Sequence, residues 1–202
     1  MKHATGGVNT HKGAIFSLGI YCAALGMGYD GEKSDACTAL MRCGEMTRER
    51  MAQELECIDA QQARTFGEEI YQKSRIGGVR AEAASGFAAV REFALPRLRN
   101  ALSAGLNLND AGLCALVSLM AHTQDTNAVR RGGEEMAEKL REGAAALDAK
   151  IESHLKEGNL EKQMNSIRQA LVRWDEAMSE KRISPGGCAD LLALTLLAEF
   201  ME

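Results

Sequence analysis

A glycine-rich stretch with polar side chains, GGVNTHKG, occupies residues 6–13 and leads directly into an apolar run. Glycines let main-chain N–H groups approach a ligand closely, and a helix start carries a partial positive charge. Lys12 adds a full positive charge, so Gly6, Gly7 and Asn9 lie beside a cation in a segment that favours phosphate. The spacing differs from a P-loop, because no glycine precedes Lys12 and no serine or threonine follows it. The alternative is a glycine turn beside a solvated lysine.

A second small-residue stretch, GGVRAEAASGF, covers residues 77–87. Arg80 and Glu82 follow the glycine pair directly, and small residues come after them. Small residues permit close approach of either a ligand or a second helix. The stretch therefore indicates either a ligand contact or a tight helix crossing with two solvated charges.

A polar cluster, AHTQDTNAVRRGG, covers residues 121–133 and follows the apolar segment LCALVSLM. A helix that is apolar on nearly all sides is expected to be buried. Its end would then deliver the polar cluster to the interior or to a cleft. His122 and Asp125 are plausible there as metal ligand, base or acid. The alternative is a capped helix end in which Arg130 and Arg131 pair with Asp125.

The last such stretch, SPGGCADLLALTLLAEF, covers residues 184–200. Ser184 is expected to cap a helix, the proline after it suits the first turn, and Gly186 and Gly187 leave that turn bare. This arrangement favours an anion at the helix start. Asp190 follows inside an apolar helix, and a buried carboxylate needs a cation, a metal or hydrogen-bond donors. The alternative is a structural ion pair with an arginine.

The composition favours one helical domain. The chain has 202 residues, of which 46% are hydrophobic and 4% aromatic, and it contains two prolines. A chain of this length can bury a sizeable core, and abundant alanine, leucine and methionine favour helices over strands. Apolar residues recur with helical spacing, and no segment alternates as a strand would. The sequence therefore predicts an all-α fold, with residues 1–202 forming a single-domain multi-helix bundle or array.

Charge, cysteine spacing and targeting signals bear on the class of protein. The formal net charge is −4 with no basic stripe, which argues against nucleic acid as the main partner. The six cysteines form no C-x-x-C pair, which argues against zinc. The start shows no signal-peptide pattern, and the longest apolar run, residues 188–201, is too short to span a bilayer. We expect a cytoplasmic protein with reduced cysteines and no membrane partner.

The helices that must position these stretches follow from start and stop signals. Ser34 and Asn109 are expected to cap helices, and Gly44 is expected to end one. Pro96 suits the first turn of a helix. The expected helices cover residues 11–27, 34–43, 47–74, 80–93, a segment from 96, 110–122, 128–155, 160–181 and 185–200.

The four stretches, in this order, resemble the triphosphoribosyl-dephospho-CoA synthase family. The resemblance covers nearly the whole chain and rests on GGVNTHKGAIFSLG, AEAASGF, LVSLMAHTQDTNAVRRGG and SPGGCADLLALTLL. It implies an all-helical enzyme that joins ATP to 3′-dephospho-CoA, releases adenine and leaves a triphosphoribosyl group on the 2′-hydroxyl of the CoA ribose. The product would be the precursor of the prosthetic group carried by the acyl carrier subunit of citrate lyase or malonate decarboxylase.

The resemblance also implies site residues and a metal. A carboxylate can stabilise the oxocarbenium-like ribose, a base can accept the hydroxyl proton, and a histidine can assist adenine departure. The triphosphate is expected to bring Mg²⁺, for which Asp125 and Asp190 are the predicted shared ligands. The roles of base and metal ligand stay open among the carboxylates. The catalytic candidates are Glu82, Asp125, Asp190, His11 and His122, and the substrate-binding candidates are Gly6, Gly7, Asn9, Lys12, Arg80, Asn127, Arg130, Ser184, Gly186 and Gly187.

The sequence departs from the family pattern in two places. Family members carry an upstream segment with stretches resembling KPGLVDR and GAHxDM, whereas this chain begins at the glycine motif. Ala81 and Ala88 stand where the family reads glycine and proline in RGEAASGFP. We expect an uncovered apolar surface and hence a homo-oligomer. The alternatives to the transferase are a folded but catalytically incomplete nucleotide-binding fragment, a helical interaction module, and a nucleosidase that hydrolyses ATP to adenine.

Overall fold

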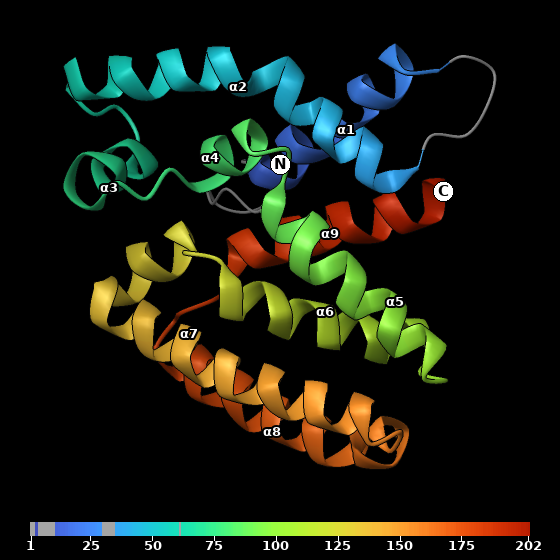
Figure 1. Ribbon diagram of the computed structural model, residues 1–202. Helices are drawn as coiled ribbons and strands as arrows, with labels where there is room; N and C mark the ends of the chain where they lie inside the picture. Colours follow the sequence, from blue (N-terminus) through green and yellow to red (C-terminus); the bar gives the residue numbers. More distant parts are fainter. Residues whose placement is uncertain (1–2, 4–10, 30–34, 61) are drawn as a thin grey trace. The chain divides into compact units, whose positions relative to one another are not determined.

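The computed structural model describes residues 3, 11–29, 35–60 and 62–202. Every regular element in these ranges is a helix, so the predicted all-α fold is confirmed (Figure 1). Within them, no helix is both long and apolar enough to cross a bilayer. The elements are α1 (Lys12–Met27), α2 (Ala36–Ala60), α3 (Phe66–Ser74), α4 (Gly78–Ala84), the π-helical turn η1 (Val90–Ala94), α5 (Leu95–Ser103), α6 (Leu108–His122), α7 (Thr126–Lys156), α8 (Leu160–Glu180) and α9 (Gly186–Met201).

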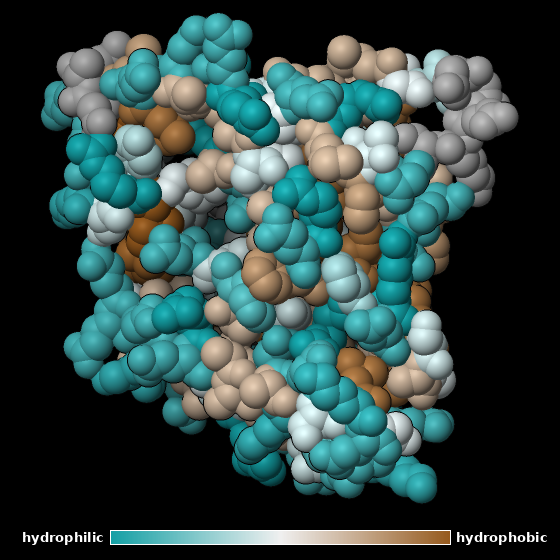
Figure 2. All heavy atoms as spheres, in the orientation of Figure 1, coloured by the Kyte–Doolittle hydropathy of each residue, from teal (hydrophilic) through white to brown (hydrophobic). Residues whose placement is uncertain are grey.

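The chain forms two compact units. The first unit comprises Met1–Ala88 and Ala189–Glu202, and it contains α1 to α4 and most of α9. The second unit comprises Ala89–Cys188 and contains η1 and α5 to α8. Figure 2 shows that hydrophilic side chains cover much of the face in view, with smaller apolar areas between them. The candidate residues divide between the two units.

The first unit is built on α2, which packs against α1, α3 and α4. Tyr21, Leu40 and Phe87 are fully buried in this core. Gly44 lies inside α2 where the helix meets the end of α4, and a Cβ atom there would fall 2.8 Å from the main-chain nitrogen of Gly86. The glycine therefore permits a close helix crossing, and the prediction that it ends a helix was wrong.

The same crossing is closed by a side-chain hydrogen bond. The hydroxyl of Thr47 donates at 2.8 Å to the carbonyl of Ala83, near the C-terminal end of α4. The same carbonyl accepts the main-chain N–H of Gly86 at 3.0 Å, in the turn that ends α4. Thr47 thus lies within α2 and joins it to α4, whereas the sequence predicted that a helix begins there.

The second unit is built on α6, which packs against η1, α5 and α7. Val117 and Leu119 of α6 are fully buried, as its apolar composition predicts. Helices α7 and α8 lie side by side as a hairpin whose turn contains Gly158, at φ 66° (Figure 1). A Cβ atom at Gly143 of α7 would fall 2.3 Å from Cζ2 of Trp174 of α8, so the missing side chain makes room for the indole.

Three further helix boundaries differ from the prediction. The segment expected to be one helix over residues 47–74 is split, because a capping box at Thr65 and Glu68 begins α3 anew. The expected helix over residues 80–93 is interrupted where Phe87 adopts a left-handed conformation, at φ 50°. Asn107 caps α6 in place of Asn109, since its side-chain oxygen accepts the N–H of Asp110 at 3.0 Å. The predicted cap Ser34 lies outside the described residues.

Candidate functional site

The Asp190 carboxylate lies against the beginning of α1 in the first unit. A Cβ atom at Gly13 would fall 2.0 Å from Oδ2 and 3.0 Å from Cγ of Asp190. Gly13 is the second residue of α1, in the turn where main-chain N–H groups lack intrahelical acceptors and the helix dipole is positive. Asp190 is half-buried, and the helix start gives its negative charge a favourable partner.

Two more candidates stand at this helix start. His11 occupies the N-cap position of α1 without a side-chain cap hydrogen bond, and Lys12 is the first helical residue. Both side chains are exposed. The structure therefore brings His11, Lys12 and the Asp190 carboxylate to one end of one helix. Gly6, Gly7 and Asn9 lie outside the described residues.

Asp125 of the second unit has main-chain partners for both oxygens. Oδ1 accepts the N–H groups of Asn127 at 2.7 Å and of Ala128 at 3.2 Å, which caps α7. Oδ2 accepts the N–H of Cys188 at 3.0 Å, in the first turn of α9. Asp125 thus joins the start of α7 to the first turn of α9 through Cys188, which lies 63 residues further along the chain. This is the capped helix end that the sequence left open, with main-chain donors as the partners.

The predicted anion seat at residues 184–187 meets the polar cluster of residues 121–133. A Cβ atom at Gly187 would lie 3.2 Å from the Asp125 carboxylate, and one at Gly186 would lie 3.0 Å from the Asn127 amide nitrogen. The start of α9 therefore holds a carboxylate of the protein itself. Ser184, two residues before Gly186, is half-buried. Arg130 is exposed and lies in the first turns of α7.

His122 ends α6 and stacks on Phe93. Their ring centroids are 3.9 Å apart and the planes differ by 10°. Nδ1 of His122 lies 2.9 Å from the carbonyl oxygen of Ser118. Because a carbonyl can only accept, Nδ1 carries the proton in this geometry, and Nε2 of the neutral ring is an acceptor. The exposed imidazole can take up and return a proton at Nε2.

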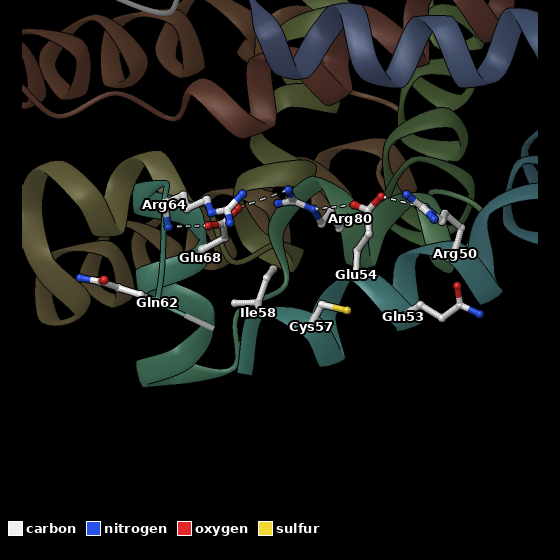
Figure 3. Close-up of a pocket in the computed structure, with 9 residues that line it drawn as sticks. All are labelled: Arg50, Gln53, Glu54, Cys57, Ile58, Gln62, Arg64, Glu68 and Arg80. Carbon is white, nitrogen blue, oxygen red and sulfur yellow. Dashed lines mark hydrogen bonds and ion pairs between the residues drawn. The ribbon is translucent and has the colours of Figure 1, made fainter. Parts of the chain in front are cut away.

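Arg80 lies at a cavity of about 460 Å³ in the first unit (Figure 3). Its Nε is 3.2 Å from Oε2 of Glu54, and its Nη2 is 3.8 Å from Oε1 of Glu68. Glu82, two residues further along α4, is half-buried and its carbonyl accepts the N–H of Phe87 at 2.7 Å. The cavity is lined by Arg50, Gln53, Glu54, Cys57, Ile58, Gln62, Arg64, Glu68 and Arg80.

Sequence reasoning found Arg80 but missed the rest of this cavity. Arg50 and Arg64 carry no motif, and they come from α2 and from the segment before α3. The one local signal was the T-x-x-E capping box of Thr65 and Glu68, which places a carboxylate beside the cavity. The main-chain N–H of Arg64 donates to Glu68 at 2.7 Å and holds the pKa of this carboxyl below its ordinary value.

The described residues include no cluster of three or more histidine, cysteine, aspartate or glutamate side chains that could hold a metal. A carboxylate has about four lone-pair positions, and Asp125 already uses three of its own for main-chain N–H groups. Mg²⁺ that accompanies a nucleotide needs only one or two carboxylates, because phosphates and water complete its shell. The donors present therefore fit a metal held mainly by a substrate.

One family of proteins matches the chain over its whole length. The family model described as ATP:dephospho-CoA triphosphoribosyl transferase matches residues 1–202. A 2-(5″-triphosphoribosyl)-3′-dephosphocoenzyme-A synthase of Pectobacterium atrosepticum is 41% identical over 198 residues, which are 98% of this chain and 60% of the relative. A probable synthase of the same name from Photobacterium profundum is 35% identical over 212 residues, covering 100% of this chain and 62% of the relative.

The chain spans about three fifths of the length of these curated relatives. No solved structure matches it.

Proposed function

Because the chain belongs to the ATP:dephospho-CoA triphosphoribosyl transferase family, we propose that it transfers the triphosphoribosyl group of ATP to 3′-dephospho-CoA. The bond between C1′ of the ATP ribose and adenine breaks. A bond forms from C1′ to the 2′-oxygen of the dephospho-CoA ribose, and the proton of that hydroxyl is transferred to the released adenine. The product is 2′-(5″-triphosphoribosyl)-3′-dephospho-CoA, which would serve as the prosthetic-group precursor of citrate lyase or malonate decarboxylase.

The contact between Asp190 and the start of α1 carries this proposal. Loss of adenine leaves positive charge on the ribose, which a nearby carboxylate stabilises. Lys12, beside the Asp190 contact at Gly13, supplies a cation for the triphosphate of the same nucleotide. We assign ribose stabilisation to Asp190 and phosphate binding to Lys12, with Gly6, Gly7 and Asn9 as further phosphate contacts. Glu82 is the candidate base for the acceptor hydroxyl.

The polar cluster at Asp125 supports a second part of the proposal. Asp125 fixes the segments around Asn127 and Gly187 by its three main-chain hydrogen bonds, so its first role is to position them. His122 is the candidate acid for adenine, because an imidazolium can donate a proton to a ring nitrogen of the leaving base. His11 is the alternative for the same step.

Mg²⁺ belongs to the proposal as the ion that accompanies ATP. When bound, it would neutralise charge on the triphosphate, with Asp125 and Asp190 as the predicted protein ligands. Asp125 could offer the ion one lone pair at most. Mg²⁺ binding that is unchanged in a variant carrying both Asp125→Asn and Asp190→Asn would overturn this assignment.

Self-association also belongs to the proposal. Large apolar side chains on α1 and in the turn after it are exposed, among them Ile15 at 61%, Met27 at 70% and Tyr29 at 73%. Exposed apolar side chains gathered on one element favour burial against a partner. We propose a cytoplasmic homo-oligomer, and light scattering coupled to size exclusion measures its mass.

The central experiment is incubation of the purified chain with ATP, Mg²⁺ and 3′-dephospho-CoA. We expect free adenine by chromatography and the coupled product by mass spectrometry. Adenine without coupled product would indicate a nucleosidase. If neither forms, thermal melting with ATP separates a nucleotide-binding fragment from an interaction module, because a ligand at about one hundred times its Kd stabilises the fold by about 2.7 kcal/mol.

A further inference from the structure

The cavity between α2, α3 and α4 has the size and charge of an anion site. Its volume of about 460 Å³ lies in the range of small-molecule pockets. The lining includes three arginines and two glutamates, so its formal charge is +1. Gln53 and Gln62 add neutral amide donors, whereas Cys57 and Ile58 supply a less polar wall. All of these residues belong to the first unit.

The ion pairs of the cavity hold its guanidinium groups in position. Glu54 accepts from Nε of Arg50 at 3.1 Å through one oxygen and from Nε of Arg80 at 3.2 Å through the other. Arg80 also reaches Glu68, so it bridges the carboxylates of α2 and α3 (Figure 3). Each guanidinium has five N–H donors, and these ion pairs engage Nε of Arg50 and Nε and Nη2 of Arg80. Further donors of Arg50 and Arg64 are available to a ligand.

We infer that this cavity binds a diphosphate, and that in the transferase reaction its occupant is the diphosphate of 3′-dephospho-CoA. This assignment of the occupant rests on the proposed function. Planar guanidinium forks match the oxygens of a phosphate better than a single ammonium does. The reaction brings together two polyanions, and the triphosphate is assigned to the start of α1 beside Lys12. The acceptor needs cations of its own, and Arg50, Arg64 and Arg80 supply them.

Cys57 makes the inference testable without any activity assay. Its thiol lines the cavity and is exposed, so a maleimide can label it in the folded protein. Cys22 is exposed on α1 and does not line the cavity, which makes it an internal control. Cys43 is buried, and burial raises the pKa of its thiol to about 12, so its labelling reports unfolding.

The experiment measures labelling rates of individual cysteines by peptide mass spectrometry. The probes are inorganic pyrophosphate, 3′-dephospho-CoA and ATP. At about ten times its Kd, a ligand fills about nine tenths of the sites, so Cys57 should react about tenfold more slowly while Cys22 is unchanged. Unchanged labelling of Cys57 with pyrophosphate and with dephospho-CoA would overturn the site. If ATP protects Cys57 at lower concentrations than 3′-dephospho-CoA does, the assignment of dephospho-CoA as the occupant is overturned.

Charge-removing variants sharpen the test. Arg50→Gln and Arg64→Gln each remove one cation while leaving the bridge of Arg80 intact. The Arg50 side chain is exposed, so its replacement should leave the fold unchanged. Each should raise the pyrophosphate concentration needed for protection by about tenfold, the effect of one charge-assisted contact. Arg173→Gln, an exposed change in α8, should leave it unaltered. Equal protection in all three variants would contradict the inference.

These readouts separate the cavity from the transferase. Protection of Cys57 by pyrophosphate in a protein that releases no adenine would support the diphosphate site and contradict the proposed reaction. Adenine release with no protection would contradict the site and support the reaction. The two proposals therefore fail independently.

Discussion

Gly13 and Asp190 contact each other so closely that no side chain fits between them. A Cβ atom at Gly13 would lie 2.0 Å from the carboxylate oxygen Oδ2. The contact joins the first turn of α1 to α9 within the first unit, although the two residues are far apart in the chain. The glycine is thus required by packing, and the negative charge lies at the positive end of a helix.

Replacing Gly13 with alanine should therefore displace the carboxylate. Overpacking of this kind destabilises by about 1–3 kcal/mol, and each kcal/mol lowers the Tm of a chain this size by about 2–4 °C. Adenine release should fall by about 10²-fold if Asp190 acts on the ribose, since a shift of 1 Å is enough for such a loss. Thermal melting and an adenine assay on the same preparation measure both effects.

Gly19→Ala is the matched control on the same helix. Nothing lies within 4 Å of a Cβ atom at Gly19, so alanine should stabilise α1 by about 0.5–1 kcal/mol. A variant carrying both Gly13→Ala and Asp190→Ala should recover the melting temperature and still lack activity. If Gly13→Ala melts and turns over like the unchanged protein, the contact does not constrain the carboxylate.

The crossing of α2 and α4 gives a second prediction. A Cβ atom at Gly44 would fall 2.8 Å from the nitrogen and 3.0 Å from the Cα of Gly86, and main-chain atoms cannot rotate away. Gly44→Ala should lower stability by about 1–3 kcal/mol, whereas Gly26→Ala, with nothing within 4 Å, should not. Urea unfolding measures both variants, and equal midpoints would show that the helices can separate without loss.

The predictions for α1 and for Gly44 show which features can be predicted from the sequence alone. The limits of α1 were predicted within one residue, because its glycine stop and apolar composition are local. Gly44 was taken as a stop, because a glycine in a sequence does not tell whether it ends a helix or admits a neighbour. Its role depends on Gly86, which lies in the turn after α4.

The candidate sites also divide into local contacts, which the sequence can predict, and contacts between distant residues, which it cannot. The cap that Asp125 forms on Asn127 is local and was open to prediction, but its bond to Cys188 spans 63 residues. The cavity around Arg80 gathers Arg50 and Arg64 from irregular spacings, and only the packing of α2, α3 and α4 brings them together. No sequence motif predicts a group of side chains that only tertiary packing brings together.

Asp125 should be sensitive to the shape of its replacement. Asp125→Ala removes the acceptor for three N–H groups, and loss of the cap on α7 alone should destabilise by about 0.5–2 kcal/mol. Asp125→Asn retains one oxygen for the cap but turns an N–H₂ group toward the N–H of Cys188, so its loss should be smaller. Urea unfolding ranks the two, with the exposed Asp175→Ala as control. An asparagine variant less stable than the alanine variant would contradict the capping role.

Asp110 gives a prediction about pH. Its carboxylate accepts from Nε of Arg168 at 2.7 Å and from the amide of Asn107 at 2.7 Å. The guanidinium hydrogen bond, opposed by burial and assisted by Asn107, holds the pKa of Asp110 below its ordinary value. A carboxyl whose pKa is lower in the folded state binds its proton more readily when unfolded. The stabilisation is therefore complete above the unfolded pKa and is lost as pH falls through the folded pKa.

Asp110→Asn should accordingly melt at a lower temperature than the unchanged protein at pH 7, because the buried position loses its charged partner for Arg168. The difference between the two melting temperatures should shrink as the pH is lowered from about 6 toward 3, across the range in which aspartate takes up its proton. Asp175→Asn, on the exposed face of α8, should show no such convergence. A gap that stays constant over this range would mean that Asp110 acts through its shape and not through its charge.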